Sequence, residues 1–328
     1  ELVVNQDARA TKFSHDNEIA KPHYYKVTFD NGITTEMAPT TRGVHLRFSY
    51  PTTGDAYLVL DGYTDMSEIK IDPAKRQISG WVNNQRFVND SKSFRNYFVV
   101  QFDKSFEDYG VWENQKDEVF PQKLDGSGKG YGAFIKFKKG SKVQAKAASS
   151  YISAEQALIT LNKELGKDKN LEVTKARGQK TWNEVLNRIV VEGCTDCLLY
   201  TSDAADFRAN LFSRKFYERK ENGEPYYYSP YNGKIYDGYM YTDNGFWDTF
   251  RSQFPLTNIL HPTMQGRYMN ALLAAQEQCG WLPSWSSPGE TGGMLGNHPI
   301  SLLADAWAKG IRDFDPEKAL KAYAHEAM

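Results

Sequence analysis

Hydrophobic residues in this chain follow one period before Ser153 and another after it. In residues 44–50 apolar side chains alternate with polar ones, which is typical of a half-buried β-strand. In residues 154–166 leucines recur at helical spacing instead. Because the two periods belong to different local structures, the sequence predicts strands up to about residue 153 and helices after it.

The part before residue 153 reads as many short strands separated by Gly, Asn, Asp and Pro. The expected strands are residues 25–29, 33–37, 44–50, 57–60, 69–71, 80–82, 97–102, 133–137 and 143–147. Asn31-Gly32 lies between the first two and is typical of a tight hairpin turn. No helical pattern separates the strands, which favours an antiparallel β-sandwich.

The part after residue 153 reads as helices joined by long loops. Ser153 and Gln156 form a capping box at the start of the first helix, and Gly166 is expected to end it. Further helices are expected around 182–189, from about 244, over about 264–279, after 299 and after 315. Two long loops, 221–239 and 281–296, are rich in Tyr, Trp, Gly and Pro, and such loops usually carry function.

Composition limits the classes of partner. With 40 Lys and Arg against 41 Asp and Glu, the net charge is −1, so neither nucleic acid nor anionic lipid is an expected partner. No apolar run approaches the roughly 18 residues of a membrane span, so membrane insertion is not expected. Aromatic residues make up 14% of the chain, which suits an uncharged ligand that stacks on rings, such as a sugar, although rings also fill protein cores.

Cysteines and chain ends add two expectations. Three cysteines cannot all pair with one another, which excludes a disulfide scaffold. The chain starts at Glu1 rather than Met, and its last helical pattern has no stop signal, so both ends are expected to lie inside a longer protein.

The segment Tyr241–Arg251 combines features of a sugar site. Asp243 or Asn244 is expected to cap a helix, which places Trp247 and Asp248 in its first turn. An indole can cover the apolar face of a pyranose, and a carboxylate can accept hydrogen bonds from its hydroxyls. The competing interpretation is structural: Asp248 favours the helix N-terminus and pairs with Arg251. Trp247, Asp248 and Arg251 are therefore candidate ligand-binding residues.

Two further segments offer candidate binding residues. Trp281 and Trp285 lie four residues apart in a proline-braced loop and could form a stacking platform or a plug in the core. Asn297 or His298 is expected to cap the next helix, and His298 could also donate to a sugar hydroxyl.

Other motifs have a structural interpretation beside a functional one. Residues 13–18 could line a site, but a turn is favoured. Acidic residues between 103 and 118 lack metal-ligand spacing and are expected at the surface. Glycines alternating over 126–132 predict a hairpin loop rather than a phosphate site, because no helix follows. Cys194 and Cys197 have redox spacing without the strand and helix of such a site.

Taken in order, several segments resemble glycoside hydrolase family 92, the calcium-dependent exo-acting α-mannosidases common in gut Bacteroidetes. The matching stretches are residues 13–18 with Tyr24-Tyr25, 213–217, 228–231, 242–251, 280–283 with Trp285, 296–298, 304–306 and 309–310. The Trp-Asp block at 247–248 and the Trp-Leu-Pro block at 281–283 are the specific ones. The chain departs from the family pattern at Ser213, where Pro is usual, and throughout residues 197–206.

The resemblance implies a fold and a function. It implies a galactose-mutarotase-like β-sandwich over residues 1–153, two linker helices over 154–190 and the first part of an (α/α)6 barrel over 191–328. It implies removal of terminal α-linked mannose from N-glycans or mannans, with inversion and with Ca²⁺, in the periplasm, at the cell surface or outside the cell. The substrate-binding residues would be Trp247, Asp248, Arg251, Trp281, Trp285, Asn297 and His298.

The resemblance also implies that the catalytic pair lies elsewhere. The family's acid sits in an Asn-Glu-Pro block and its base in a later Asp-rich block, and neither occurs in these 328 residues. The acid, the base and the Ca²⁺ ligands are expected downstream, so the isolated chain is expected to be inactive. A non-catalytic mannose-binding module is the alternative, and a structural domain without a ligand is favoured if Trp247, Trp281 and Trp285 are fully buried.

Overall fold

The computed structural model describes residues 1–62, 65–83, 94–193 and 195–327, apart from the side chains of residues 199–203. The described residues form two compact units. The first contains those up to 185 except Phe94, and the second contains Phe94 and those from 186 onwards. Each unit is described separately below.

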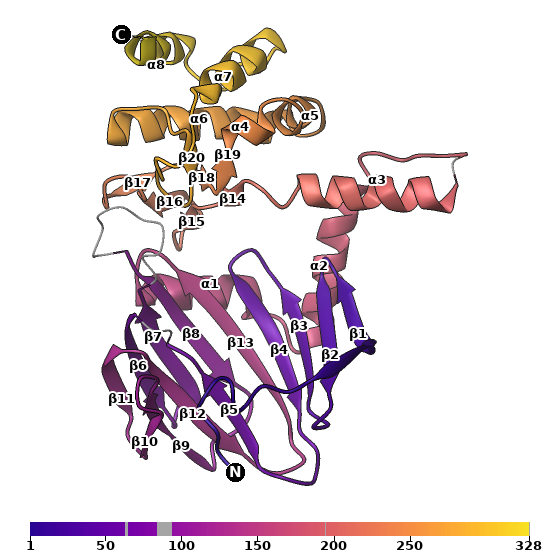
Figure 1. Ribbon diagram of the computed structural model, residues 1–328, viewed down its shortest axis with the longest axis vertical. Helices are drawn as coiled ribbons and strands as arrows, with labels where there is room; N and C mark the ends of the chain where they lie inside the picture. Colours follow the sequence, from indigo (N-terminus) through magenta and orange to yellow (C-terminus); the bar gives the residue numbers. More distant parts are fainter. Residues whose placement is uncertain (63–64, 84–93, 194, 328) are drawn as a thin grey trace. The chain divides into compact units, whose positions relative to one another are not determined.

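The first unit is a β-sandwich in which every strand pair is antiparallel (Figure 1). Its strands are β1 (Phe13–Lys21), β2 (Tyr24–Phe29), β3 (Thr34–Pro39), β4 (Gly43–Ser49), β5 (Ala56–Leu60), β6 (Met66–Asp72), β7 (Gln77–Val82), β8 (Asn96–Phe102), β9 (Asp108–Glu113), β10 (Glu118–Pro121), β11 (Asp125–Lys129), β12 (Tyr131–Phe137) and β13 (Lys142–Ser150). Nine of them form one sheet in the order β1-β2-β3-β4-β13-β8-β7-β6-β11, and the other sheet has the order β10-β9-β12-β5. The predicted antiparallel sandwich is confirmed.

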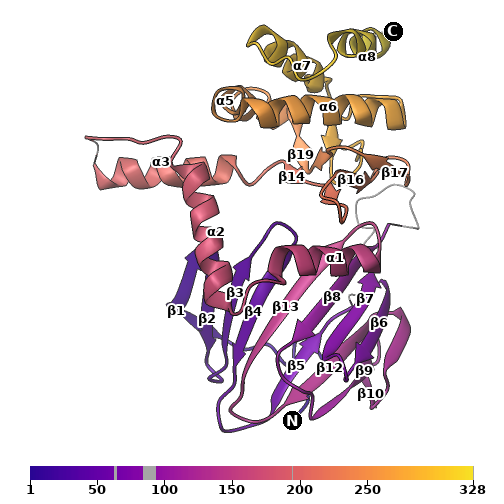
Figure 2. The same ribbon diagram turned by 180° about the vertical axis from the view of Figure 1, so that it is seen from behind.

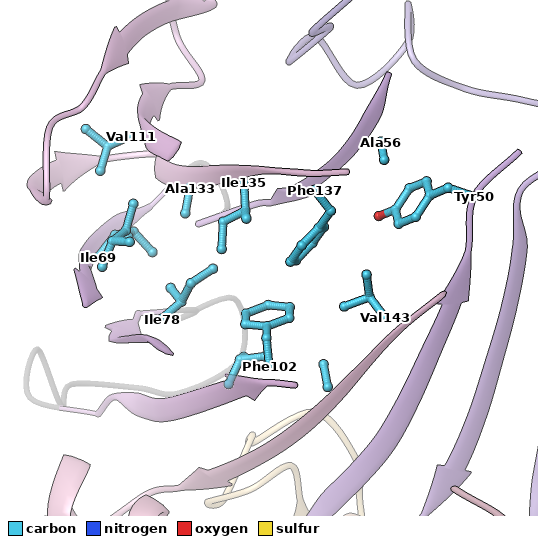
Figure 3. Close-up of a cluster of buried hydrophobic side chains, with 13 residues drawn as sticks. Tyr50, Ala56, Ile69, Ile78, Phe102, Val111, Ala133, Ile135, Phe137 and Val143 are labelled. Carbon is cyan, nitrogen blue, oxygen red and sulfur yellow. The ribbon is translucent and has the colours of Figure 1, made fainter. Parts of the chain in front are cut away.

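The core of this unit lies between the two sheets (Figure 3). Ile135 and Phe137 on β12 face residues of the larger sheet, among them Ile78 on β7 and Phe102 on β8. The Phe102 and Phe137 ring centroids are 5.6 Å apart. Burial of apolar side chains from both sheets is the main force that holds the layers together.

Two helices complete the first unit, α1 (Ala154–Leu165) and α2 (Leu171–Leu186). α1 packs on β13 and β8 (Figure 2). Half of the predicted capping box is confirmed at its start, where the Gln156 backbone N–H donates to Ser153 Oγ at 3.1 Å, whereas the Ser153 backbone N–H donates to Ser150 Oγ at 3.3 Å. α2 is joined to the sheet by Arg47, which makes two 2.6 Å hydrogen bonds to Glu36 and also pairs with Glu172 on α2.

Two interpretations of the β region are wrong. Residues 13–18 lie in strand β1 rather than in a turn: Phe13 pairs with Phe29 and Glu18 with Val27 on β2, with a register shift between them. Residues 126–129 belong to β11, which pairs with β6, so only the end of the glycine-rich segment forms a turn. A polar or glycine-rich strand at a sheet edge lacks the apolar alternation on which the prediction depended.

The second unit contains helices joined by long loops with short strands. Its helices are α3 (Asp196–Ala209), α4 (Phe246–Thr249), α5 (Gln253–Leu260), α6 (Pro262–Cys279), α7 (His298–Ala308) and α8 (Pro316–Ala327). Its strands are β14 (Arg214–Lys215), β15 (Glu218–Arg219), β16 (Pro225–Tyr228), β17 (Ile235–Asp237), β18 (Tyr241–Thr242), β19 (Asn244–Gly245) and β20 (Trp285–Ser286). The predicted end of α6 and the predicted start of α8 are confirmed. Gly280 closes α6 in the left-handed conformation, and at the start of α8 Asp315 Oδ1 accepts from the N–H groups of Glu317 and Lys318.

Two helix predictions need correction. The helix expected around 182–189 ends at Leu186, because the chain from 187 onwards leaves α2. The helix expected from Asn244 starts at Phe246, and it is interrupted after Thr249 before α5 begins at Gln253. The predicted division into residues 1–153, 154–190 and 191–328 and the barrel assignment of the last part stay predictions.

Candidate functional site

Strands β19 and β20 form the support of the candidate site. They pair antiparallel, with Gly245 opposite Trp285 and Asn244 opposite Ser286. Asn244 is buried, and its amide donates to Ser213 Oγ at 2.8 Å and accepts from Thr249 Oγ1 at 2.6 Å. The Ser213 hydroxyl is the acceptor of the first of these bonds. These bonds fix the chain immediately before Trp247 and Asp248.

Asp248 and Trp285 lie on the same side of Gly245. A Cβ atom at residue 245 would lie 3.0 Å from Asp248 Oδ2 and 3.7 Å from Trp285 Nε1. Gly245 has an ordinary φ of −93°, so the constraint on residue 245 comes from the nearby Asp248 carboxylate and not from its backbone angle. A carboxylate and an indole therefore meet above a glycine.

Asp248 lies in the first turn of α4, as both interpretations expected, but its predicted pairing with Arg251 and the predicted cap of the helix are wrong. Arg251 does not pair with Asp248: the guanidinium donates to the Trp247 carbonyl and lies 4.4 Å from the Phe250 ring centroid. The N-cap position of α4 is Gly245, so neither Asp243 nor Asn244 caps this helix. Within the described part of the chain no group donates a hydrogen bond to the exposed Asp248 carboxylate. A carboxylate at a helix start with no donor is available to sugar hydroxyls.

His298 lies in an aromatic surround beside Trp247. Its ring stacks on Phe250 with centroids 4.4 Å apart and an interplanar angle of 12°, and Trp247 meets it edge-on at 5.2 Å. Gly296 backs the imidazole, because a Cβ atom there would lie 2.7 Å from His298 Nε2. That nitrogen is buried without a hydrogen-bond partner among the described residues. His298 thus offers one unused polar atom within an apolar wall.

The three candidate tryptophans are not buried. The exposed fractions are 42% for Trp247, 55% for Trp281 and 39% for Trp285. The interpretation of the Trp281 and Trp285 loop as a core plug is therefore wrong, and so is the condition that favoured a structural domain without a ligand. Exposed indoles on a structured loop are typical of surfaces that stack on sugars or other rings.

The carboxylate of Glu290 holds the Trp285 loop in place. Its oxygens accept from the backbone N–H of Ser284 at 2.7 Å, from Ser284 Oγ at 2.8 Å, from the N–H of Gly292 at 2.8 Å and from the N–H of Trp285 at 3.3 Å. Charged acceptors make the stronger hydrogen bonds in proteins. Sequence reasoning missed Glu290. The available signal was a single carboxylate between Gly289 and Gly292 in a long loop.

Trp281 and Asn297 contact the last helix instead. The Trp281 ring lies 4.6 Å from the His325 ring, measured between centroids. Glu326 Oε2 accepts from Asn297 Nδ2 at 2.5 Å, and Glu326 Oε1 accepts from the backbone N–H of Leu282 at 2.6 Å. Asn297 occupies the N-cap position of α7 but makes no side-chain capping bond. Sequence reasoning missed Glu326, which no motif marks.

The structure thus places the seven predicted residues in two groups. Trp247, Asp248, Arg251, Trp285 and His298 are linked through contacts around Gly245 and Phe250. Trp281 and Asn297 are linked through α8, and the adjacent residues Asn297 and His298 connect the groups along the chain. Trp281 and Trp285 therefore have different surroundings and do not form one platform by contact with each other.

The acidic residues do not assemble a metal site in the described part of the chain. Among residues 1–62, 65–83, 94–193 and 195–327, no three His, Cys, Asp or Glu side chains group closely enough to hold a metal ion. The residues present therefore do not fit a Ca²⁺ site by themselves. Among the same residues no helix has the length and apolar character needed to cross a membrane.

Comparison with known proteins identifies the family of both parts. Residues 2–150 match the model of the glycosyl hydrolase family 92 N-terminal domain, and residues 156–328 match that of the family's catalytic domain. An inverting mannosidase of the family from Bacteroides thetaiotaomicron is 41% identical, with a TM-score of 0.95 over 99% of this chain and 44% of its own. A second family α-mannosidase from that bacterium is 25% identical, with a TM-score of 0.85 over 97% of this chain and 44% of its own.

A curated relative agrees with this family. It is described as an uncharacterized secreted glycosidase of Arthroderma benhamiae and is 22% identical over 258 residues, which cover 69% of this chain and 33% of the relative. The chain therefore spans about a third of this relative and less than half of the solved mannosidases. Since the two family models together match nearly all of its residues, and its sandwich and helices superpose on solved members, the chain belongs to glycosyl hydrolase family 92.

Proposed function

We propose that the whole protein is an exo-acting α-mannosidase that removes terminal mannose from N-glycans or mannans with inversion. The observation that carries this proposal is the exposed Asp248 carboxylate, which has no donor among the described residues and borders Gly245 together with the Trp285 indole. A ring that covers an apolar sugar face and a carboxylate that accepts two hydroxyls together recognise a pyranose. The 41% identical relative is itself an inverting mannosidase, which supports mannose as the sugar.

The proposed roles of this chain are binding and orientation. Asp248 would accept two mannose hydroxyls, Trp247 and Trp285 would bound the ring, and His298 Nε2 and Asn297 Oδ1 would meet further hydroxyls. Arg251, which lies against the rings of Trp247 and Phe250, would hold Trp247 in place. Trp281 would contact the sugar from the neighbouring loop.

Bond cleavage requires groups beyond these. An inverting enzyme needs an acid on the leaving oxygen and a base that activates water on the opposite face, separated by roughly 6.5–9.5 Å. The sequence blocks expected to carry that pair do not occur here, so we propose that the 328-residue chain binds mannose without hydrolysing its glycosides. Ca²⁺ dependence likewise requires ligands from outside these residues. A secreted relative supports a location in the periplasm, at the cell surface or outside the cell.

The test is mannose release from α-mannosides and high-mannose glycans by the whole protein, with the first-formed anomer followed by NMR. Release of β-mannose, loss of activity with a calcium chelator and its return with Ca²⁺ are the expected results. Release of α-mannose would contradict inversion, and full activity in chelator would contradict the calcium requirement.

A non-catalytic mannose-binding module is the second candidate. The exposed indoles and the exposed Asp248 carboxylate favour it, because binding alone needs no acid and base. One measurement distinguishes the two proposals. Hydrolysis of an α-mannoside by the whole protein supports the enzyme, and binding without hydrolysis supports the binding module.

A further inference from the structure

Glu326 connects two separate pieces of the candidate site. One carboxylate oxygen accepts from the backbone N–H of Leu282, next to Trp281, and the other accepts from the side-chain amide of Asn297. These donors are 44 and 29 residues away in the sequence. We propose that Glu326 is a positioning residue that orients the Asn297 amide and the Trp281 turn toward the sugar, an inference that rests on the proposed function.

The charge of Glu326 decides which way the Asn297 amide faces. A carboxylate accepts hydrogen bonds and donates none, so only the NH₂ group of Asn297 can face it. The Oδ1 atom must then point away, and it is buried with no hydrogen-bond partner among the described residues. Buried polar atoms in folded proteins almost always have a partner, and leaving one unmade is costly. A sugar hydroxyl would supply the missing donor.

The helix that carries Glu326 is held at both ends. Asp315 caps the start of α8, and Lys318 pairs with Glu277 on α6 at 2.8 Å. At the other end the His325 ring lies against Trp281. Glu326 is therefore presented by a fixed element, which is what an orienting group requires.

The substitution Glu326→Gln tests this role with little change in shape. An amide has one acceptor oxygen and one donor nitrogen, so Gln can satisfy either Leu282 or Asn297 but not both. Glu317→Gln is the matched control, because it removes the same charge from the exposed face of the same helix. Two quantities are measured in the whole protein. The first is hydrogen–deuterium exchange in peptides that contain Leu282, and the second is the affinity for mannose.

We expect Glu326→Gln to speed exchange at Leu282 and to weaken mannose binding about tenfold, while Glu317→Gln changes neither. In an Asn297→Ala background the effect of Glu326→Gln on affinity should be smaller, because one of the two groups that Glu326 orients is gone. Unchanged affinity, or an equal loss in the Asn297→Ala background, would each overturn the inference. If the unsubstituted protein does not bind mannose, the proposed function is refuted even when exchange at Leu282 is faster. The inference is then refuted too, because it rests on that function.

Discussion

Trp285 lies directly opposite Gly245 in a two-stranded pair, and the Asp248 carboxylate approaches the same glycine from α4. The absence of a side chain at residue 245 lets the indole and the carboxylate come together. A small polar and aromatic site thus depends on a residue that contributes no side chain. That dependence leads to the first prediction.

Gly245→Ala should weaken mannose binding about tenfold without lowering stability. The new methyl group would lie 3.0 Å from Asp248 Oδ2, closer than ordinary van der Waals contact, so the carboxylate must shift by a few tenths of an ångström, while the indole at 3.7 Å can stay. The backbone angle at residue 245 suits alanine, so the free energy of unfolding should stay the same or rise slightly. Titration calorimetry with mannose and thermal melting measure the two effects. A lower melting temperature with unchanged affinity would contradict the prediction.

Asp248→Ala should cost about 2–4 kcal/mol of transition-state stabilisation in the whole protein, the scale of losing a charged hydrogen bond to substrate. Folding should change by about 1 kcal/mol at most, because the side chain is exposed and makes no hydrogen bond within the described residues. Comparison of kcat/KM with the melting temperature separates the two. Asp237→Ala is the control, since Asp237 is an exposed residue of β17 that forms an ion pair with Lys220. Full activity with a lowered melting temperature would show that Asp248 is only structural.

Glu290→Gln should loosen the loop from Ser284 to Gly292. The carboxylate accepts four hydrogen bonds there, and an amide nitrogen cannot accept those that face it. We expect a loss of about 1.5–3 kcal/mol in the stability of the loop, detected as faster hydrogen exchange and faster proteolysis. Glu277→Gln removes a carboxylate from an exposed ion pair with Lys318 and should cost about 1 kcal/mol or less. Equal effects of the two substitutions would contradict the assigned role of Glu290.

The β-sandwich should lose stability as pH falls from about 6.5 to 4. Burial, and after it the charge of Lys146, lowers the pKa of His45 to about 4. The unfolded chain therefore binds a proton between these pH values that the folded chain does not, so stability rises with pH across this window and is complete above it. Calorimetric melting across the window should show the slope, and His45→Gln should flatten it.

A second window below pH 4.5 belongs to Glu36. Burial opposes ionisation of this carboxyl, but hydrogen bonds from Arg47 and Tyr24 outweigh it and lower the pKa of Glu36 to about 2. A lowered carboxyl pKa stabilises the folded state above the unfolded value, and this stabilisation is lost as pH falls toward the folded value. The melting temperature of the His45→Gln variant should therefore still fall below pH 4.5. A flat profile there would contradict the Glu36 assignment.

Local signals predicted local structure well. The Asn31-Gly32 turn, the helix cap at Ser153 and the glycine that ends α6 all depend on a few adjacent residues, and the structure has each of them. The helix expected from Asn244 was predicted less well, because the pairing of β19 with β20 delays its start to Phe246. The strand at 13–18 was missed because its support comes from β2 rather than from its own pattern.

The sequence by itself determined that strands precede helices, where several helices begin and end, and which family the Trp-Asp and Trp-Leu-Pro blocks resemble. Those properties follow from hydrophobic period and from short motifs, which are local. Only the tertiary structure decided that Trp285 meets Gly245, that Arg251 serves Trp247 rather than Asp248, and that Glu290 and Glu326 hold the loops of the site. Each of these contacts depends on how a side chain or a loop is oriented in the folded chain, and many join residues far apart in the sequence. Spacing along the chain does not encode that geometry.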